Sequence, residues 1–229
     1  MISDALRIDI EKWASTKDQR ALFAMAKSGR LTRPMVRTYI ANVTYLIERT
    51  PGHLRRARER ASALGDERLA GHYAHKLDEE EGHSVWGEAD LESLSDVSTA
   101  GLGSSVTPAI AACASYLTKI IDEDPALYLT HLAFTEYVTV LLGPELLADI
   151  ESRCGVPRSS MTVVDNHIEL DREHAEEGFG IIDDLVGDPK KLAPMRRALA
   201  GLLEHFDRFC EEVTADRATA HEPAHVSAA

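Results

Sequence analysis

The stretch from Ala126 to Leu142 constrains the fold of this chain more than any other part of its sequence. It is apolar around nearly the full circumference of a helix, and Glu136 is its one formally charged residue. The stretch is slightly short for a membrane span. A helix that is apolar on all sides is typical of the centre of a helical bundle. We therefore expect this segment to be a buried central helix.

The rest of the sequence also favours helices. No segment alternates apolar and polar residues with enrichment in β-branched side chains, and helix-forming residues dominate throughout. Pro51–Gly52 and Gly65 are expected to interrupt or end helices. Capping residues and prolines predict helix starts at Ser3–Asp4, Thr32–Pro34, Asp66, Thr107–Pro108, Asp124–Pro125, Ser159–Ser160 and Pro189.

These segments predict one all-α domain, a bundle of about seven helices over residues 1–217. The helix that begins at Asp66 is expected to continue through Leu94, and one long loop follows from Ser95 to Thr107. Residues 218–229 are expected to form a flexible C-terminal tail.

Charge and cysteine content exclude several classes of protein. The formal net charge is -13, with 38 acidic and 25 basic residues, which argues against non-specific binding to nucleic acid or to anionic membranes. The three cysteines, Cys113, Cys154 and Cys210, form no CxxC pair, so neither a disulfide framework nor a structural zinc site is expected. The N-terminal residues contain no basic leader followed by an apolar core. We therefore expect a cytoplasmic protein that binds neither nucleic acid nor membranes.

The segment NHIELDREH places three potential metal ligands on one side of a helix. His167, Asp171 and His174 are spaced by four and three residues, so they fall within about 60° of one another. Two imidazoles and a carboxylate on one stripe form half of a metal site if the stripe faces inward. The alternative is a solvated charged face that happens to carry two histidines.

Carboxylates elsewhere in the sequence extend this set. Glu136 lies on the apolar central helix, where a carboxylate is costly unless it is paired, protonated or bound to metal. Glu80 and His83 form a Glu-x-x-His pair, a recurring half-site of dimetal proteins built in helical bundles, although Glu79 competes with Glu80 for this role. Glu48, at the border of an apolar helix face, is the candidate for one more carboxylate.

Together these residues predict a site for two metal ions. Four carboxylates would balance the charge of two divalent cations, and oxygen and nitrogen ligands without a thiolate suit iron or manganese better than structural zinc. Non-haem iron with such ligands is a site for activating O₂. The predicted ligands are Glu48, Glu80, His83, Glu136, His167, Asp171 and His174.

The order of these motifs resembles the haem-oxygenase-like diiron oxidases and oxygenases, whose fold group also includes thiaminase-II-like and pyrroloquinoline-quinone-synthase-like proteins. The resemblance covers residues from about 30 to 190 and is strongest at His167-x-x-x-Asp171-x-x-His174. It implies a haem-oxygenase-like bundle, two iron ions (Fe²⁺/Fe³⁺) or manganese in their place, and O₂ as co-substrate. It also implies that Glu48 and the Glu80–His83 pair help to hold one iron.

The resemblance further implies a reaction type. A peroxo-diiron(III) species would oxidise a small-molecule substrate, which is an amino acid, an amine or a fatty acid. The outcome would be N-oxygenation, desaturation or C–C cleavage. The reaction is compatible with an external electron donor. The fold is compatible with a homodimer. Gly178, one turn after His174, would leave space for a substrate beside the site.

Two alternatives stay open at this point. One is a metal-independent enzyme of the same fold, thiaminase-II-like, which would use Cys113 or Cys154 with a carboxylate. The other is a non-catalytic all-α binding protein. A true haem oxygenase is disfavoured, because the first histidine, His53, lies in a basic segment rather than early in the chain. Convergence of the predicted ligands in space separates the dimetal enzyme from these alternatives.

Overall fold

The described chain, residues 1–95 and 106–215 of a computed structural model, consists of helices and short 3-10 turns, with no strand in these ranges. The predicted all-α class is confirmed, although the described part contains ten α-helices rather than about seven. The expected long loop lies mostly outside the described residues, as does the expected tail. The helices are α1 (Ile2–Ala14), α2 (Ala21–Lys27), α3 (Arg33–Ile47), α4 (Thr50–Ala63), α5 (Glu67–Glu80), α6 (Ser84–Ser93), α7 (Pro108–Glu123), α8 (Tyr128–Cys154), α9 (Thr162–Leu185) and α10 (Leu192–Thr214).

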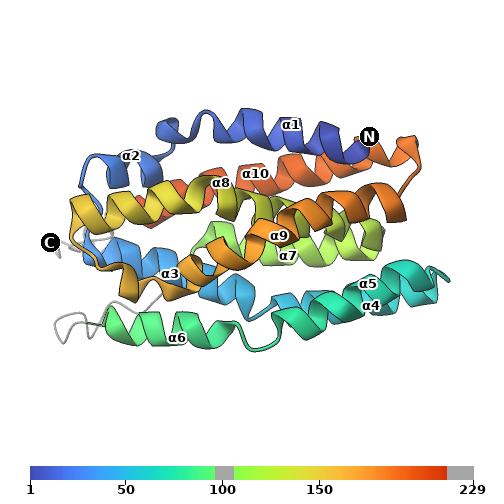
Figure 1. The fold of residues 1–229 in the computed structure, drawn as a ribbon, viewed down its shortest axis with the longest axis horizontal. Coiled ribbons are helices and arrows are strands. Elements are labelled where there is room, and N and C mark those ends of the chain that lie inside the picture. The colour runs from blue at the N-terminus through green and yellow to red at the C-terminus, as the bar shows by residue number, and fades with distance from the viewer. Residues whose placement is uncertain (96–105, 216–229) are drawn as a thin grey trace, which may run out of the picture.

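The apolar segment forms the first part of α8, which lies in the middle of the bundle (Figure 1). This helix packs against α9 along most of its length and also contacts α1, α2, α7 and α10. By length and hydropathy the segment Pro125–Cys154 passes as a candidate membrane span, but 72% of its apolar window is buried inside the protein. The expectation of a buried central helix is therefore confirmed.

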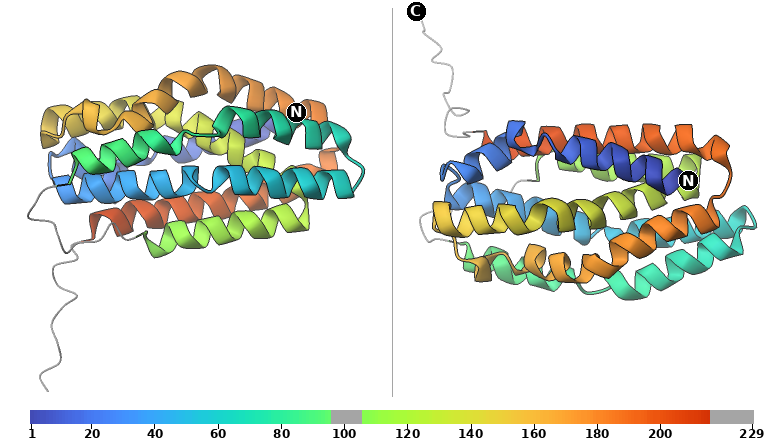
Figure 2. Two further views of the ribbon diagram at one scale, coloured as in Figure 1. Left: turned by 90° about the horizontal axis from the view of Figure 1, so that it is seen from below. Right: turned by 45° about the horizontal axis from the view of Figure 1, so that its top comes forward.

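Two pairs of helices run end to end along one side of the bundle. The chain passes along α3 and α4, turns at Gly65, and returns along α5 and α6 (Figures 1 and 2). The interruption near Pro51 is confirmed, since α3 ends at Ile47 and α4 begins at Thr50. Both interruptions, between α3 and α4 and between α5 and α6, leave the chain irregular midway along the molecule.

The predicted single helix from Asp66 to Leu94 is wrong. It is divided into α5, which ends at Glu80, and α6, which begins at Ser84. The cause is Gly82, whose φ of +92° lies in the left-handed region where only glycine is free of strain. The Glu-x-x-His pair therefore spans a break between two helices and does not lie on one helix face.

Four of the seven predicted helix starts are confirmed by capping hydrogen bonds, one of them from the Ala126 N–H to Asp124. Thr32, Asp66 and Thr107 each accept a hydrogen bond from the backbone three residues on. Ser159 and Ser160 do not cap α9, contrary to expectation, because they belong to a 3-10 turn that precedes it.

The N-terminus of α9 is held instead by a side chain from another helix. Buried Asp90 of α6 accepts hydrogen bonds from Thr162 Oγ1 and from the Val163 backbone N–H, both at 2.8 Å. A carboxylate at a helix N-terminus satisfies free donors and complements the helix dipole. Asp90 thus ties α9, which carries His167, to α6, which begins directly after His83.

Candidate metal centre

Three of the predicted ligands come together at the break between α5 and α6. Glu80 at the end of α5, His83 just before α6 and His167 on α9 each offer a ligand atom, and these atoms lie within 4.8 Å of one another. Three ligand atoms that each lie about 2.1 Å from one ion, evenly spaced around it, are about 3.6 Å apart. A metal ion would therefore fit this group after the three side chains close by about 1 Å.

The imidazole of His167 is oriented for metal binding. Its Nδ1 lies 2.6 Å from the carbonyl oxygen of Val163, and a carbonyl can only accept a hydrogen bond. Nδ1 therefore carries the proton, and Nε2 keeps its lone pair for a metal. A backbone carbonyl that fixes the tautomer in this way is a usual partner of metal-binding histidines.

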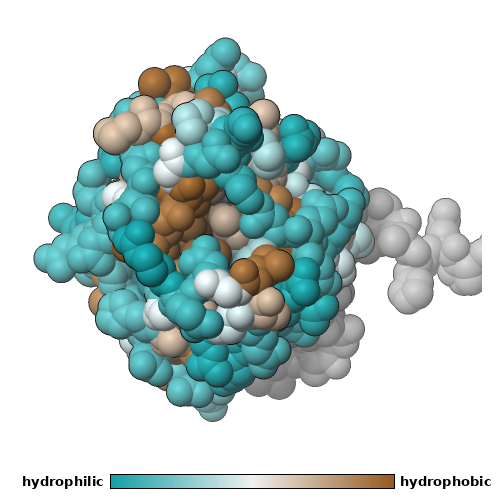
Figure 3. Space-filling view, turned by 90° about the vertical axis from the view of Figure 1, so that its right-hand side faces the viewer, coloured by the Kyte–Doolittle hydropathy of each residue, from teal (hydrophilic) through white to brown (hydrophobic). Residues whose placement is uncertain are grey.

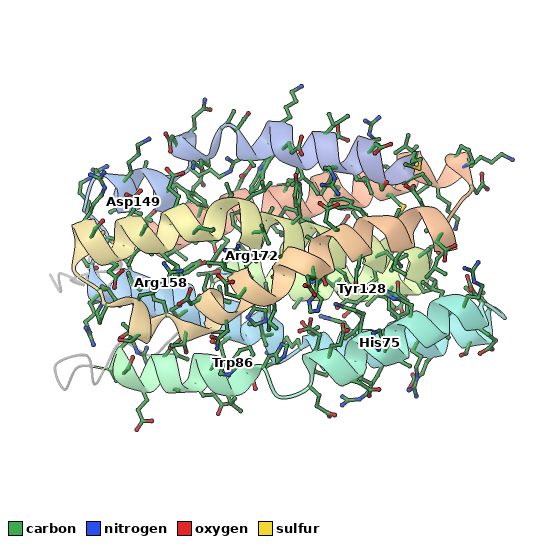
Figure 4. All side chains as sticks on the ribbon, viewed as in Figure 1. His75, Trp86, Tyr128, Asp149, Arg158 and Arg172 are labelled. Atoms are coloured by element: carbon green, nitrogen blue, oxygen red, sulfur yellow. The ribbon has the colours of Figure 1, made fainter. Side chains whose placement is uncertain are left out.

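The imidazole of His83 is held by ring contacts. It stacks on Trp86, with ring centroids 4.6 Å apart, and meets the His167 ring edge-on at 5.2 Å. Figure 4 shows Trp86 at the start of α6, facing α9. The buried Nδ1 of His83 makes no hydrogen bond and lies 3.4 Å from Glu80 Oε2. An unsatisfied buried nitrogen beside a carboxylate is what a missing cation would leave.

The remaining predicted ligands lie near the first group without converging in the same way. His174 Nδ1 lies 3.7 Å from Asp171 Oδ1 on α9, and both residues are close enough to Glu136 of α8 to act on its charge. The hydrogen bond to Asp171 raises the pKa of His174. Burial raises the pKa of Asp171 despite that hydrogen bond. The predicted inward stripe of α9 is therefore present, because Asp171 is buried and its two histidines are half-buried.

Burial also raises the pKa of Glu136, to about 7, against the opposing charge of Lys76. The pKa of Lys76 is raised above that of a free lysine. Burial alone would lower this pKa, but the charges of Glu136 and Glu79 and their hydrogen bonds with Lys76 outweigh the effect of burial. The raised pKa of Glu136 favours a neutral carboxyl group, whereas the raised pKa of Lys76 favours a charged ammonium group paired with a carboxylate. We take the ion-paired form, because the ammonium nitrogen lies 2.9 Å from a carboxylate oxygen of each glutamate.

Lys76 is the residue of this site that sequence reasoning missed. Only 8% of its side chain is exposed. A signal was available in the sequence, since Lys76 continues the buried stripe of α5 that begins with Leu69 and Tyr73 at spacings of four and three. A lysine on such a stripe must meet a carboxylate in the interior.

The structure brings neither Glu79 nor Glu48 into the three-residue group. Glu79 is held by Lys76 and by the exposed imidazole of His75, so Glu80 is the carboxylate that faces His83. Glu48 follows α3 with 46% of its side chain exposed, and its nearest charged partner is Arg49 at 3.5 Å. The predicted ligands other than Glu48 are thus buried or half-buried, whereas Glu48 lies at the surface.

The site lies between two cavities. An inner cavity of about 190 Å³ is lined mainly by apolar side chains of α3, α8 and α10, and at one end by Glu80, Glu136, His167 and Asp171. An outer pocket of about 330 Å³ is lined by residues of α5, α8 and α9, among them Lys76, His174 and Gly178. Glu136 and Leu132 border both. Figure 3 shows the end of the bundle that lies at the right of Figure 1, where hydrophobic residues are visible in a hollow inside a hydrophilic rim.

His131 is a second polar side chain that sequence reasoning did not assign. It is buried and lines the inner cavity, and its Nδ1 has no hydrogen-bond partner. Burial lowers its pKa to about 3, so the ring is neutral near pH 7. Its position one turn before Thr135 and Glu136 on an apolar helix is the sequence signal that marks it.

Comparison with known proteins identifies the fold. No protein-family model and no curated protein sequence matches the chain. Among solved structures, it is similar to a domain of unknown function with a haem oxygenase-like fold from Shewanella denitrificans OS217, with a TM-score of 0.81 and 17% identity over 92% of this chain and 90% of that chain. It is also similar to a TenA homologue from Pseudomonas syringae pv. tomato DC3000, with a TM-score of 0.69 and 16% identity over 92% and 91% of the two chains. The chain therefore has the haem-oxygenase-like fold that the sequence predicted.

Proposed function

We propose that this protein is a non-haem diiron enzyme that uses O₂ to oxidise a small organic substrate with an aliphatic portion. One observation supports it above the others. Glu80 and His83, on either side of the break between α5 and α6, and His167 of α9 converge within 4.8 Å, all three half-buried, and Glu80 and His167 also line the inner cavity. A binding protein without metal gives no reason for this convergence.

The donor set suits this chemistry. Carboxylate oxygens and imidazole nitrogens without thiolate favour iron or manganese, and manganese stays an alternative metal. When bound, two ferrous ions would supply electrons and open coordination positions for O₂. Glu80, His83 and His167 would hold one ion, and Glu136, Asp171 and His174 would hold the other.

The protein side chains around the site orient the ligands and exclude water. The Val163 carbonyl fixes the ring of His167, and Trp86 supports the ring of His83. Leu132 and Phe134, both nearly fully buried, line the inner cavity together with Glu80, Glu136 and His167, so these ligands share an apolar surrounding. A dry site protects a reactive oxygen species from side reactions with water.

The inner cavity favours an aliphatic substrate over a small amino acid. Its lining is mainly apolar, and the amide of Asn42, one of its polar groups, already bonds to Thr38 O and the Thr107 N–H. An alkyl chain in this cavity would place C–H bonds beside Glu80 and His167, two of the residues that would hold the metals. This arrangement favours desaturation or C–C cleavage over N-oxygenation, with a fatty acid or a long-chain amine as substrate. Each buried methylene would strengthen binding by about 0.8 kcal/mol.

The test is an anaerobic Fe(II) titration of the metal-free protein, followed by rapid mixing with O₂ and optical detection, with and without a series of fatty acids. We expect two Fe(II) per chain, an O₂-dependent transient absorbance, and tighter binding of longer chains until the cavity is full. His83→Ala and Glu136→Ala should each lower the iron stoichiometry. Negligible iron binding in the unaltered protein would overturn the proposal.

The cysteine-dependent alternative has less support. Burial raises the pKa of Cys113 to about 12, so this thiol, which lines the inner cavity, is a poor source of the nucleophilic thiolate. Cys154 is half-buried on the far part of α8 and its Sγ donates to the Ala26 carbonyl. Neither thiol lies in the three-residue group.

A further inference from the structure

The ammonium group of Lys76 lies beside Glu136, which is one of the predicted ligands of the second metal ion. Its ammonium nitrogen lies 2.9 Å from Glu136 Oε1 and 2.9 Å from Glu79 Oε2. Its charge also acts on Glu80 and on His174, so it lies among the ligands of both halves of the site. One positive charge held by two carboxylates is the electrostatic role of a metal ion.

The two halves of the site differ in whether a cationic side chain is paired with their carboxylates. Within the described residues, Glu80, His83 and His167 converge with no lysine or arginine side chain paired to Glu80, and the Nδ1 of His83 lies 3.4 Å from Glu80 Oε2. On the other side, Glu136 already has a cationic partner. A metal ion can therefore enter the first half by closure of its three side chains and without displacing a cation, whereas in the second half it must displace the ammonium group.

We propose that the ammonium group of Lys76 is the resident cation of the second half-site, and that it and a second metal ion exclude each other. This inference rests on the proposed dimetal function. It predicts that the metals bind in order, first at Glu80, His83 and His167, then at Glu136, Asp171 and His174. The second ion binds more weakly, because it must break a buried ion pair.

The outer pocket gives the displaced lysine a place to go. Lys76 lines this pocket together with Glu79 and with Glu177, whose carboxylate is exposed. A lysine side chain is long and flexible, so its ammonium group can swing toward the pocket while its stem stays packed on α5. The side chain of Glu79 is only partly buried, so it can move together with the ammonium group. Glu136 would keep its position and bind the metal ion.

The first test is a Mn²⁺ titration of the metal-free full-length protein, with free Mn²⁺ measured by electron paramagnetic resonance. In the unaltered protein we expect one tight site and a second site at least about tenfold weaker, which corresponds to about 1.4 kcal/mol. Lys76→Met removes the charge and keeps the length of the side chain. It should tighten the second site about tenfold and leave the first unchanged.

Lys119→Met is the matched control, because it makes the same change in charge at an exposed lysine paired with Glu123. It should alter neither site. Two equal sites in the unaltered protein, unchanged by Lys76→Met, would overturn the inference and leave the dimetal function standing. No Mn²⁺ or Fe²⁺ binding to any of these proteins would overturn both.

A second measurement needs no variant and so does not depend on the folding of Lys76→Met. An amine-reactive reagent is applied to the unaltered protein at increasing Mn²⁺ occupancy, and modification of each lysine is followed by mass spectrometry. We expect Lys76 to be protected until the first ion is bound and to become reactive as the second ion binds, while Lys119 reacts equally throughout. A lysine 76 that stays protected with two ions bound would contradict the proposal.

Discussion

His131 shows what a single buried imidazole does to the stability of the metal-free protein. Its ring is neutral in the folded state, because burial lowers its pKa to about 3, whereas in the unfolded chain its pKa is near the usual value of 6.5. The unfolded state therefore binds a proton first as the pH falls. The stability that the neutral ring contributes is fully present above pH 6.5 and is lost progressively between that pH and about 3.

We predict that His131→Gln flattens the acid side of the stability profile. Between pH 7.5 and pH 5, the unaltered protein should lose about 2 kcal/mol more of its free energy of unfolding than the variant loses. The measurement is urea unfolding of both metal-free proteins at the two pH values. Because glutamine also changes packing, the comparison uses the change with pH and not the absolute stability. Equal losses in the two proteins would show that His131 is protonated in the folded state.

At the scale of one helix, α9 depends on a carboxylate from α6. Replacing Asp90 by alanine leaves the Thr162 hydroxyl and the Val163 N–H without their acceptor. We predict a loss of about 1–3 kcal/mol in the free energy of unfolding and weaker binding of the first metal ion, because His167 follows on the next turn. Thermal unfolding and Mn²⁺ titration measure both. Asp78→Ala, at an exposed aspartate of α5, is the control and should change neither.

The two glycines of α9 provide a matched pair. A Cβ at Gly178 would lie 3.0 Å from Glu136 Oε2, whereas a Cβ at Gly180 would meet nothing within 4 Å. Gly180→Ala should therefore stabilise the protein by about 0.5–1 kcal/mol through its helix propensity alone. Gly178→Ala should lose part of this gain and weaken binding of the second ion by roughly tenfold, since Glu136 must shift. Chemical unfolding and Mn²⁺ titration of both variants test this, and identical behaviour would mean that Glu136 has room to move.

Sequence patterns predicted the elements whose causes are local. The apolar circumference of α8 and the caps at Thr32, Asp66 and Thr107 depend only on nearby residues, and the structure confirms them. The break at Gly82 was missed because a glycine within a charged helical run is compatible with either a helix or a turn.

The parts of the site that depend on distant residues were less predictable. Spacing placed His167, Asp171 and His174 on one side of α9, because helical periodicity is local. It could not show that Asp90 caps this helix or that Lys76 meets Glu136, since both contacts join helices far apart in the sequence. Glu48 still has helical backbone angles one residue past the end of α3, but it lies at the border of the apolar face, where periodicity does not decide between an inward and an outward side chain.

For the molecule as a whole, the metal is expected to contribute to stability. An ion that binds only the folded state, present at 100 times its dissociation constant, adds about 2.7 kcal/mol to the free energy of unfolding. For a chain of 229 residues this corresponds to a rise of about 5–10 °C in Tm. We predict this rise on adding Mn²⁺ to the metal-free protein, measured by calorimetry. His83→Ala should abolish it, while His205→Ala, on α10, should retain it.

The gap between α5 and α6 has a mechanical consequence. Glu81 and Gly82 are exposed, and they separate Glu80, at the end of the α4–α5 hairpin, from His83, which leads into the helix packed on α3 and α9. A protease that cuts between Glu81 and Gly82 would put these two ligands on different fragments. A bound ion would then link the two fragments through Glu80 and His83, and a chelator would remove this link. The protein would behave as a two-piece assembly whose pieces are joined through an ion as well as through their packed helices.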